Sequence, residues 1–325
     1  MARILVTGGA GYIGSHTAHY LLRLGHDVQV VDDLSHGYAH NVPAGRLHVL
    51  NLLDTAGLDA LLARFAFDAV VHFAAFIEVG ESTRRPEKYF RNNCGATFSL
   101  LDAMARAGVR RIVFSSTAAV YGNPERTPIT EDMPHRPVNP YGQTKLVVET
   151  AMRWMDQGSG LRFVALRYFN ACGAEEAFGI GEEHDPETHL IPLVLRAART
   201  GQPLTVFGRD YPTPDGTCIR DYVHVSDLAA AHAAALDHLT GGGASASFNA
   251  GTGQGYSVLE VIRAVEQVAG GTVPYTVGPR RAGDPAILVA DSTRLQQALG
   301  WKPDYTTLDS MVESAWKFDQ RKHGH

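Results

Sequence analysis

The sequence has few cysteines, no long apolar run and no recognisable export signal. Its three cysteines, Cys94, Cys172 and Cys218, are far apart, with neither CxxC spacing nor histidine partners at metal-ligand intervals. They are typical of buried thiols in a reducing compartment. No stretch approaches the ~20 apolar residues that span a membrane, and the apolar run over residues 4–6 is too short for a signal peptide. We therefore expect a cytoplasmic protein with no membrane contact and no metal site.

An excess of basic residues is also missing. The 29 Lys and Arg are outnumbered by 34 Asp and Glu, which gives a net charge of −5 and no basic surface for nucleic acid. The hydrophobic share of 45% is ordinary for a folded protein, and 325 residues are enough for a large domain and a smaller one. Any phosphate-binding site must therefore be a local feature of the chain.

The first half of the chain alternates short β-branched runs with longer helical patterns, the order that builds a parallel sheet. Beyond Gly173, loops rich in glycine, proline and acidic residues separate shorter elements. This predicts an α/β fold: a doubly wound, Rossmann-type parallel sheet over residues 1–173, and a smaller C-terminal α/β substrate domain over 174–325, with some intermixing. The predicted strands are 4–7, 28–31, 47–50, 69–73, 111–115 and 163–167. The predicted helices are 15–24, 58–65, 89–107, 141–155, 191–200, 308–318 and one after each of the caps Ser226 and Ser257.

A glycine-rich turn follows the first strand. Gly8, Gly11 and Gly14 stand three residues apart and lead into an apolar helix. Backbone without side chains can approach a pyrophosphate closely, and the helix N-terminus offers it N–H groups and a partial positive charge. Asp32 and Asp33 end the second strand, where a carboxylate can bond the ribose hydroxyls and would repel a 2′-phosphate. The turn therefore predicts NAD rather than NADP, against the alternative of a mere tight turn.

Tyr141 and Lys145 are four residues apart, which on a helix places both side chains on one face. A nearby ammonium favours the phenolate, as base catalysis near neutral pH requires of a group whose ordinary pKa is ~10. Ser115 and Thr117 end the fifth strand, at the edge where open parallel sheets bind ligands. A surface Tyr/Lys pair is the alternative, but the order of turn, hydroxyl cluster and pair favours one active site.

Together these features resemble the extended short-chain dehydrogenase/reductase family, and within it the UDP-glucose 4-epimerases. The resemblance covers nearly the whole chain. The segments that carry it are His72-Phe73-Ala74-Ala75, Val79-Gly80-Glu81-Ser82, Asn92-Asn93, Val120-Tyr121-Gly122, Arg167-Tyr168-Phe169-Asn170, Arg220-Asp221-Tyr222-Val223-His224 and Pro279-Arg280-Arg281.

The resemblance implies a role for each matching residue. Tyr141 would be the base, Lys145 would lower its pKa and hold the nicotinamide ribose, and Thr117 would hold the sugar 4-hydroxyl. The implied cofactor-binding residues are Gly8, Gly11, Tyr12, Ile13, Gly14, Asp32, Asp33, Phe73, Ala74, Ala75, Asn92, Ser115, Tyr141, Lys145 and Tyr168. The implied substrate-binding residues are Thr117, Tyr141, Asn170, His189, Leu190, Phe207, Arg220, Arg281, Asp284 and Leu288.

Three positions depart from the family pattern. Leu52 stands where an adenine-contacting aspartate is expected, and Asp54 is a candidate replacement. Ile77 stands where some relatives have a cofactor-contacting lysine, and His189 where many have asparagine beside the phosphates. These departures bear on single contacts and leave the resemblance intact.

The implied activity is reversible 4-epimerisation of UDP-glucose and UDP-galactose through a transient 4-keto sugar and bound NADH, by a homodimer. One alternative is a nucleotide-sugar 4,6-dehydratase, but Ala118-Ala119 follow Thr117 where such relatives carry Asp-Glu for proton transfer. Epimerisation of another UDP-sugar, a pentose or an N-acetylhexosamine, is a second alternative. A third is a non-catalytic NAD sensor, which the presence of Thr117, Tyr141 and Lys145 disfavours.

Overall fold

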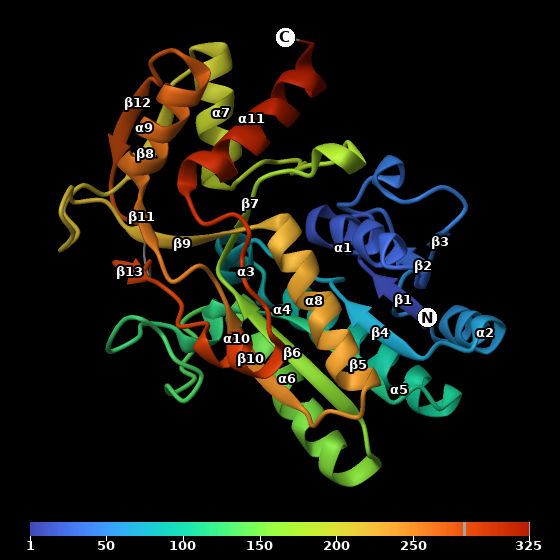
Figure 1. Cartoon of the computed structure of the whole chain (residues 1–325). Coiled ribbons are helices and arrows are strands. Elements are labelled where there is room, and N and C mark those ends of the chain that lie inside the picture. The colour runs from blue at the N-terminus through green and yellow to red at the C-terminus, as the bar shows by residue number, and fades with distance from the viewer. Residues whose placement is uncertain (282–283, 325) are drawn as a thin grey trace.

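Seven parallel strands form the central sheet of the computed structural model, which describes residues 1–281 and 284–324 (Figure 1). Their order is β10-β6-β5-β4-β1-β2-β3. All six predicted strands are present, with ends that differ by at most two residues. The strands are β1 (Arg3–Thr7), β2 (Asp27–Asp32), β3 (Leu47–Val49), β4 (Ala69–His72), β5 (Arg111–Thr117), β6 (Arg162–Tyr168) and β10 (Ala246–Ala250). The doubly wound fold predicted from the sequence is thus confirmed.

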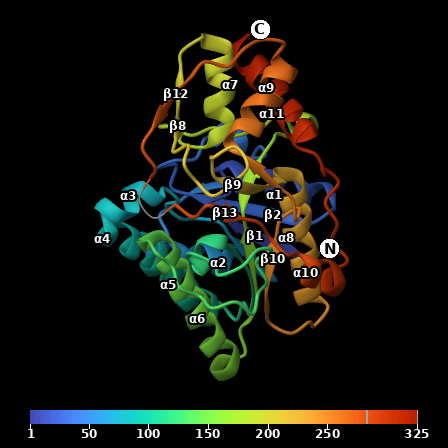
Figure 2. The same ribbon diagram turned by 90° about the vertical axis from the view of Figure 1, so that its left-hand side faces the viewer.

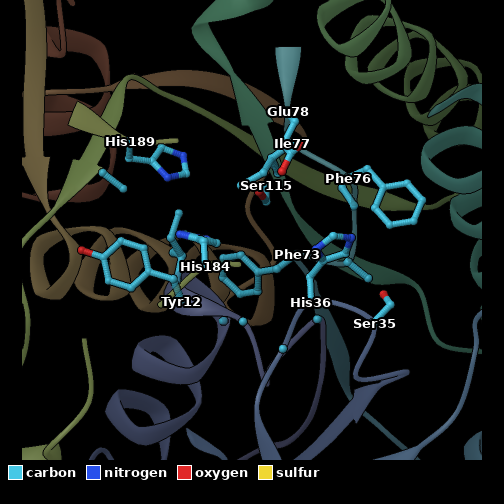
Figure 3. Close-up of a pocket in the computed structure, with 18 of the residues that line it drawn as sticks. Tyr12, Ser35, His36, Phe73, Phe76, Ile77, Glu78, Ser115, His184 and His189 are labelled. Atoms are coloured by element: carbon cyan, nitrogen blue, oxygen red, sulfur yellow. The ribbon is translucent and has the colours of Figure 1, made fainter. Parts of the chain in front are cut away.

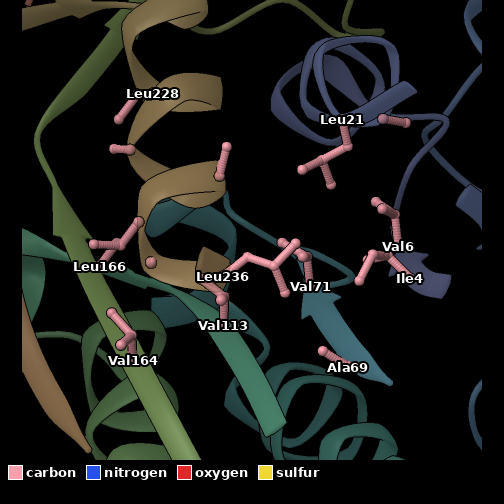
Figure 4. Packing of buried hydrophobic residues seen from close by; sticks show 14 of the residues in the cluster. Ile4, Val6, Leu21, Ala69, Val71, Val113, Val164, Leu166, Leu228 and Leu236 are labelled. Atoms are coloured by element: carbon pink, nitrogen blue, oxygen red, sulfur yellow. The ribbon is translucent and has the colours of Figure 1, made fainter. Parts of the chain in front are cut away.

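Helices cover both faces of this sheet because alternate strand residues point to opposite sides. One face packs against α1 (Tyr12–Arg23) and α8 (Val225–Thr240), and Figure 4 shows Leu21 of α1 and Leu236 of α8 directed at the strands. The other face packs against α2 (Thr55–Phe65), α5 (Thr97–Ala107) and α6 (Pro140–Ser159). The chain reverses its winding direction between β1 and β4, and this switch point is where ligands of such sheets bind.

The C-terminal region forms a second layer beyond the carboxyl edge of the sheet (Figures 1 and 2). Its own core lies between three helices and short strands. The helices are α7 (Leu190–Thr200), α9 (Val258–Ala269) and α11 (Leu308–His323), and the strands of the region are β7 (Asn170–Cys172), β8 (Leu204–Phe207), β9 (Ile219–His224), β11 (Gly255–Ser257), β12 (Tyr275–Gly278) and β13 (Ile287–Leu288). Helix α10 (Thr293–Leu299) packs instead on α8 and β10, with Leu295 buried in the core of the first region.

Elements beyond residue 173 also complete the first sheet. Strand β10 pairs with β6, and α8 packs on α1, so the two regions exchange elements across the predicted boundary. The boundary at residue 173 itself stays a prediction. Helix α8 begins at Val225, one residue before the predicted cap Ser226. Its N-cap is His224, whose ring nitrogen accepts a hydrogen bond from the Ser226 N–H (3.1 Å).

The helix predicted over 89–107 is built from three pieces: α4 (Pro86–Tyr89), a π-helical turn (Phe90–Ala96) and α5. Such turns widen a helix locally and are frequent at functional sites. Two shorter elements complete this part of the chain: α3 (Val79–Arg84), which precedes α4, and a 3₁₀ turn (Ala118–Tyr121), which follows β5. The three cysteines are buried, as predicted, and no described helix is long and apolar enough to cross a membrane.

Candidate active site

A cavity with about 370 Å³ of open space lies at the carboxyl ends of the sheet strands, where the sequence predicts ligand binding. It is walled on one side by the glycine-rich turn and on the other by residues of the C-terminal layer, and Figure 3 shows Tyr12, His184 and His189 on one flank and Ser35 and His36 on the other. Its lining includes most of the predicted site residues: Gly8, Gly11, Tyr12, Ile13, Gly14, Asp32, Asp33, Phe73, Ala74, Ala75, Asn92, Ser115, Thr117, Tyr141, Tyr168, Asn170, His189 and Leu190.

The glycines of the turn answer to two different demands. A Cβ on Gly14 would lie 2.2 Å from the Gly8 carbonyl oxygen, so this position is glycine because the protein itself leaves no space. A Cβ on Gly11 would meet only that same oxygen, at 3.4 Å, and Gly11 lines the cavity. Glycine at position 11 therefore keeps the cavity floor open rather than relieving a clash within the protein.

Helix α1 begins directly after this turn with Gly11 as its N-cap. The first backbone donor that bonds within the helix is the Ser15 N–H, to the Gly11 carbonyl (2.9 Å). The N–H groups of Tyr12, Ile13 and Gly14 precede it and have no carbonyl one turn earlier to bond. All three residues line the cavity. The floor therefore offers backbone donors and the positive end of a helix to an anionic group.

Asp32 ties the second strand to the turn. Its carboxylate accepts the N–H of Ala10 (3.0 Å) and the N–H of Leu34 (2.9 Å), while burial raises its pKa. Each carboxylate oxygen has further lone pairs, so the group can still accept ribose hydroxyls. Asp33 is more exposed and holds Asn51 through a 2.8 Å hydrogen bond.

Asp54, the candidate replacement for the aspartate missing at Leu52, is not among the residues that line the cavity. Asp54 is the N-cap of α2, and its carboxylate accepts the Gly57 N–H (3.0 Å). Leu52 is buried in the sheet-face core and also lines the cavity, so an apolar surface stands at this point. Local helix-capping chemistry therefore explains Asp54 without a ligand.

The residues predicted to move a proton lie together at the opposite end of the cavity. Thr117 ends β5, Tyr141 opens α6, and the two hydroxyls interact. Lys145 is buried one turn further along α6, with its Nζ 6.0 Å from the centre of the Tyr141 ring, and donates a hydrogen bond to the Ser115 carbonyl (2.8 Å). Ser115 in turn hydrogen-bonds the Tyr168 hydroxyl.

Burial dominates the titration of this pair. It raises the pKa of Tyr141 to about 12, against a smaller lowering by the Thr117 hydroxyl. It lowers the pKa of Lys145 to about 7, against smaller raising effects of Cys94 and Glu149. The ammonium thus faces the Ser115 carbonyl, and the pKa of the phenol is raised rather than lowered. The expected lowering of the tyrosine pKa by Lys145 stays a prediction.

A buried ion pair links the strands and the helix that carry Thr117, Tyr141 and Lys145. Glu149 of α6 binds Arg167 of β6 through two hydrogen bonds, of 3.0 and 2.6 Å, and also accepts the Ser116 hydroxyl (2.5 Å). Arg167 donates further to the Tyr121 hydroxyl (2.8 Å). Because all partners are hydrogen-bonded, the buried charges are compensated. The network joins α6 to β5 and β6 beneath Thr117 and Lys145.

Five predicted substrate-binding residues of the C-terminal layer are not among those that line this cavity: Phe207, Arg220, Arg281, Asp284 and Leu288. Four of them form two contacts: Arg220 pairs with Asp284, and the Arg281 guanidinium lies over the Phe207 ring, 4.2 Å from its centre. Leu288 pairs with Arg220 in the sheet register and packs half-buried on the cluster around Tyr121 and Ile129. Their predicted contacts with a nucleotide stay predictions.

One group of residues was missed by the sequence reasoning. Within eight positions of the loop before α7, two carboxylates and two imidazoles gather on the cavity wall. The spacing of these side chains, acid-x-His-x-x-acid-x-His, was the available signal. We call the group the 182–189 cluster; its members are Glu182, His184, Glu187 and His189.

Comparison with known proteins decides the family. Residues 4–251 match the model of the NAD dependent epimerase/dehydratase family. The chain belongs to this family. It is 49% identical to a UDP-glucose 4-epimerase of Lacticaseibacillus casei, over 98% of this chain and 96% of that one.

Solved structures agree. A UDP-glucose 4-epimerase from Brucella ovis in complex with NAD is 46% identical, with a TM-score of 0.94 and 98% coverage of both chains. A UDP-Glc/GlcNAc 4-epimerase from Campylobacter jejuni is 40% identical, with a TM-score of 0.86 over 99% of this chain and 100% of that one.

The residues present fit the dinucleotide that the family uses. The floor around Gly11 leaves room for a pyrophosphate against the N-terminus of α1, and Asp32 presents a carboxylate at the end of β2. The apolar walls include Phe73, Ala74 and Leu52. A cavity with polar groups at its ends and apolar walls between them suits a cofactor with two polar moieties.

Proposed function

We propose that the chain is a UDP-glucose 4-epimerase that interconverts UDP-glucose and UDP-galactose with NAD as its resident cofactor. The observation that carries this proposal is that one cavity is lined both by the glycine-rich turn and by Thr117 and Tyr141. The full-length similarity to proteins of this name supports the same substrate class.

A bound NAD would supply hydride transfer at C4 of the sugar, so the chain itself has to supply proton transfer and positioning. Tyr141 accepts the proton of the 4-hydroxyl at its phenolate oxygen and gives it back after the 4-keto sugar has turned over. The Thr117 hydroxyl holds the sugar oxygen next to it. Grip on the UDP moiety keeps the sugar in place between the two half-reactions.

Dehydration at C5 and C6 is less well supported. It needs an acid and a base beside the sugar, and the positions after Thr117 are Ala118 and Ala119, which carry no ionisable group. Ala118 is also buried at the start of the 3₁₀ turn. The segment that would supply these groups therefore has no proton to exchange.

Product analysis with purified chain and a panel of UDP-sugars tests the proposal. UDP-galactose should convert to UDP-glucose without added reductant and with no loss of water from the sugar. Binding of NAD with unchanged UDP-galactose would identify a sensor instead. A 4-keto-6-deoxy product would identify a dehydratase.

We further propose a cytoplasmic homodimer formed by α5 and α6. Leu101, Met104 and Met152 of these helices are buried against the sheet. On α6, Trp154 is 70% exposed, and Val147, seven residues earlier, is half-buried against the sheet-face core. A large exposed aromatic side chain is typical of association surfaces.

The dimer predicts that Trp154→Glu yields a monomer because a carboxylate cannot be buried unpaired between apolar helices. Light scattering at micromolar concentration should give a two-chain mass for the unmodified protein and a one-chain mass for the variant. The exposed Gln202→Glu, which adds the same single negative charge outside α5 and α6, serves as the control. A one-chain mass for the unmodified protein would contradict the proposal.

Substrate range is predicted to depend on Leu288. We expect weak activity with UDP-N-acetylglucosamine and a clear gain in Leu288→Ser, because a packed wall does not readily admit an acetamido group. The relative from Campylobacter jejuni named as a UDP-Glc/GlcNAc 4-epimerase supports a variable range within the fold. The packing of Leu288 on the Tyr121 cluster supports the alternative of a core residue.

The measurement is kcat/KM for both sugars in the unmodified chain and in Leu288→Ser, with melting temperature recorded alongside. A changed ratio of the two sugars with a modest loss of stability supports a wall position. An unchanged ratio with a lower melting temperature assigns Leu288 to the core and removes it from the specificity argument.

A further inference from the structure

The 182–189 cluster lies in the loop between β7 and α7. His189 is the N-cap of α7, and the cluster faces Tyr12 of α1 across the cavity flank (Figure 3). The side chains of Glu182 and Glu187 are 7% and 14% exposed, so their charges are largely withdrawn from water. Two buried carboxylates beside two imidazoles require a compensating positive charge, either protons on the rings or a cation.

The distances between the donor atoms fit a four-coordinate metal ion. His189 Nδ1 lies 3.0 Å from Glu182 Oε1 and 2.9 Å from Glu187 Oε1. His184 Nδ1 lies 3.5 Å from Glu182 Oε1 and 3.5 Å from Glu187 Oε2. Ligands held tetrahedrally at the ~2.0–2.1 Å typical of zinc are about 3.4 Å from one another. One donor atom from each member lies within 4.8 Å of all the others.

One of these potential metal-ligand atoms makes no hydrogen bond. His184 Nδ1 is buried and has no hydrogen-bond partner among the described residues, although two carboxylate oxygens lie close to it. A buried ring nitrogen without a partner is costly, and a metal ion between it and the carboxylates would use its lone pair. Glu187 Oε1 is already occupied by the N–H groups of Thr188 (2.7 Å) and His189 (2.8 Å), which leaves Oε2 toward His184.

We propose that the 182–189 cluster binds one zinc-class divalent cation through two imidazole Nδ1 atoms and two carboxylate oxygens. Such a mixed nitrogen and oxygen set suits zinc and its neighbours rather than calcium or magnesium. Two carboxylates neutralise the dication, so the filled site carries no net charge. The ion fastens the loop to the start of α7 and thereby fixes one flank of the cavity. Its role is structural and separate from the proton transfer at Tyr141.

Protons compete with a cation for this site, because an imidazole nitrogen has to be unprotonated to act as a metal ligand.

Titration of the full-length chain with Zn²⁺ after treatment with a chelator is the first test. Calorimetry should show binding of one ion per chain. Co²⁺ should give the intense visible absorption of a four-coordinate site. Less than one ion per chain, or only the weak absorption of six-coordinate Co²⁺, would overturn the proposal.

Variants locate the ion. Losing an outer partner of a metal ligand already weakens binding roughly 10- to 100-fold, so His184→Gln and Glu182→Gln should each weaken Zn²⁺ binding by at least that much. His36→Gln is the matched control, because His36 lines the same cavity on the other flank. Unchanged binding in both cluster variants, or equal loss in the control, would place the ion elsewhere. If a cluster variant does not fold, the Co²⁺ spectrum and stoichiometry of the unmodified chain decide the matter.

These readouts do not depend on catalysis. An epimerase without a bound ion would leave the proposed function standing and remove the metal site. A chain that binds Zn²⁺ at the cluster and fails to convert UDP-galactose would do the reverse.

Discussion

Tyr141→Phe is expected to lower kcat by roughly a thousandfold or more, because proton transfer by a positioned side chain contributes about 10²–10⁴ to a rate and phenylalanine has no proton to exchange. The hydroxyl points into the cavity region beside Thr117, and the ring stays packed at the start of α6. NAD binding and melting temperature should therefore change little. The measurement is steady-state conversion of UDP-galactose together with NAD content and thermal unfolding.

Tyr38→Phe provides a matched control because it removes a phenol that does not line the cavity. Its turnover should equal that of the unmodified chain. Activity of Tyr141→Phe within tenfold of the unmodified chain would remove Tyr141 as the base. Loss of NAD from the variant would show that the hydroxyl acts in cofactor binding instead.

The fold was predictable because its determinants are local and repetitive. The central sheet strands are short β-branched runs that are buried on both faces, as Val70 and Val71 of β4 show by packing in the cores on opposite sides of the sheet. The glycine turn was recognisable because Gly14 meets a steric demand that no other residue satisfies. Periodicity and backbone geometry are written directly in the sequence.

Contacts between distant segments were less predictable. Strand β10 joins the first sheet although its sequence lies far beyond the boundary signalled by loop composition. The capping role of Asp54 was not predicted, because a cap and a ligand contact require the same residue type. The pairing of Arg220 with Asp284 depends on a register that spacing alone does not reveal.

Electrostatics were the least predictable part of the site. The four-residue spacing of Tyr141 and Lys145 placed both on one face of α6, as expected. It gave no information on burial, which raises the pKa of the phenol and lowers that of the ammonium. The carbonyl that the ammonium binds belongs to Ser115, on a different strand. Desolvation is a property of the packed structure, so a spacing rule could not supply its sign for this pair.

Lys145→Met is expected to shift the alkaline-rising limb of the pH profile upward and to lower turnover at neutral pH by about 10- to 1000-fold. The sign follows from the two shifts. Burial raises the pKa of Tyr141 to about 12, so the phenolate form is scarce at neutral pH unless a positive charge stabilises it. An opposite charge within ~4–6 Å lowers such a pKa by about 1–3 units, and Lys145 Nζ lies 6.0 Å from the ring centre.

Raising the pH should therefore restore part of the activity of Lys145→Met. In the unmodified chain, burial lowers the pKa of the Lys145 ammonium to about 7. Stability moves in the other direction. A lysine whose pKa is lowered by burial destabilises the folded state fully below pH 7, and this effect fades as the pH rises from about 7 toward its ordinary pKa. Methionine in its place removes the cost of burying the charge. Any fall in melting temperature at neutral pH should therefore be no larger than the loss of the hydrogen bond to Ser115 accounts for.

Measuring kcat and kcat/KM from pH 6 to 10 for the unmodified chain, for Lys145→Met and for Lys88→Met separates these effects. Lys88 is three-quarters buried and pairs with Glu81, and it is not among the residues that line the cavity, so its loss should leave the profile unchanged. A lower rate with an unshifted profile would mean that Lys145 positions the cofactor ribose without altering the phenol. A shifted profile with partial recovery at high pH would show that the ammonium acts on Tyr141 through its charge while it donates a hydrogen bond to the carbonyl of Ser115.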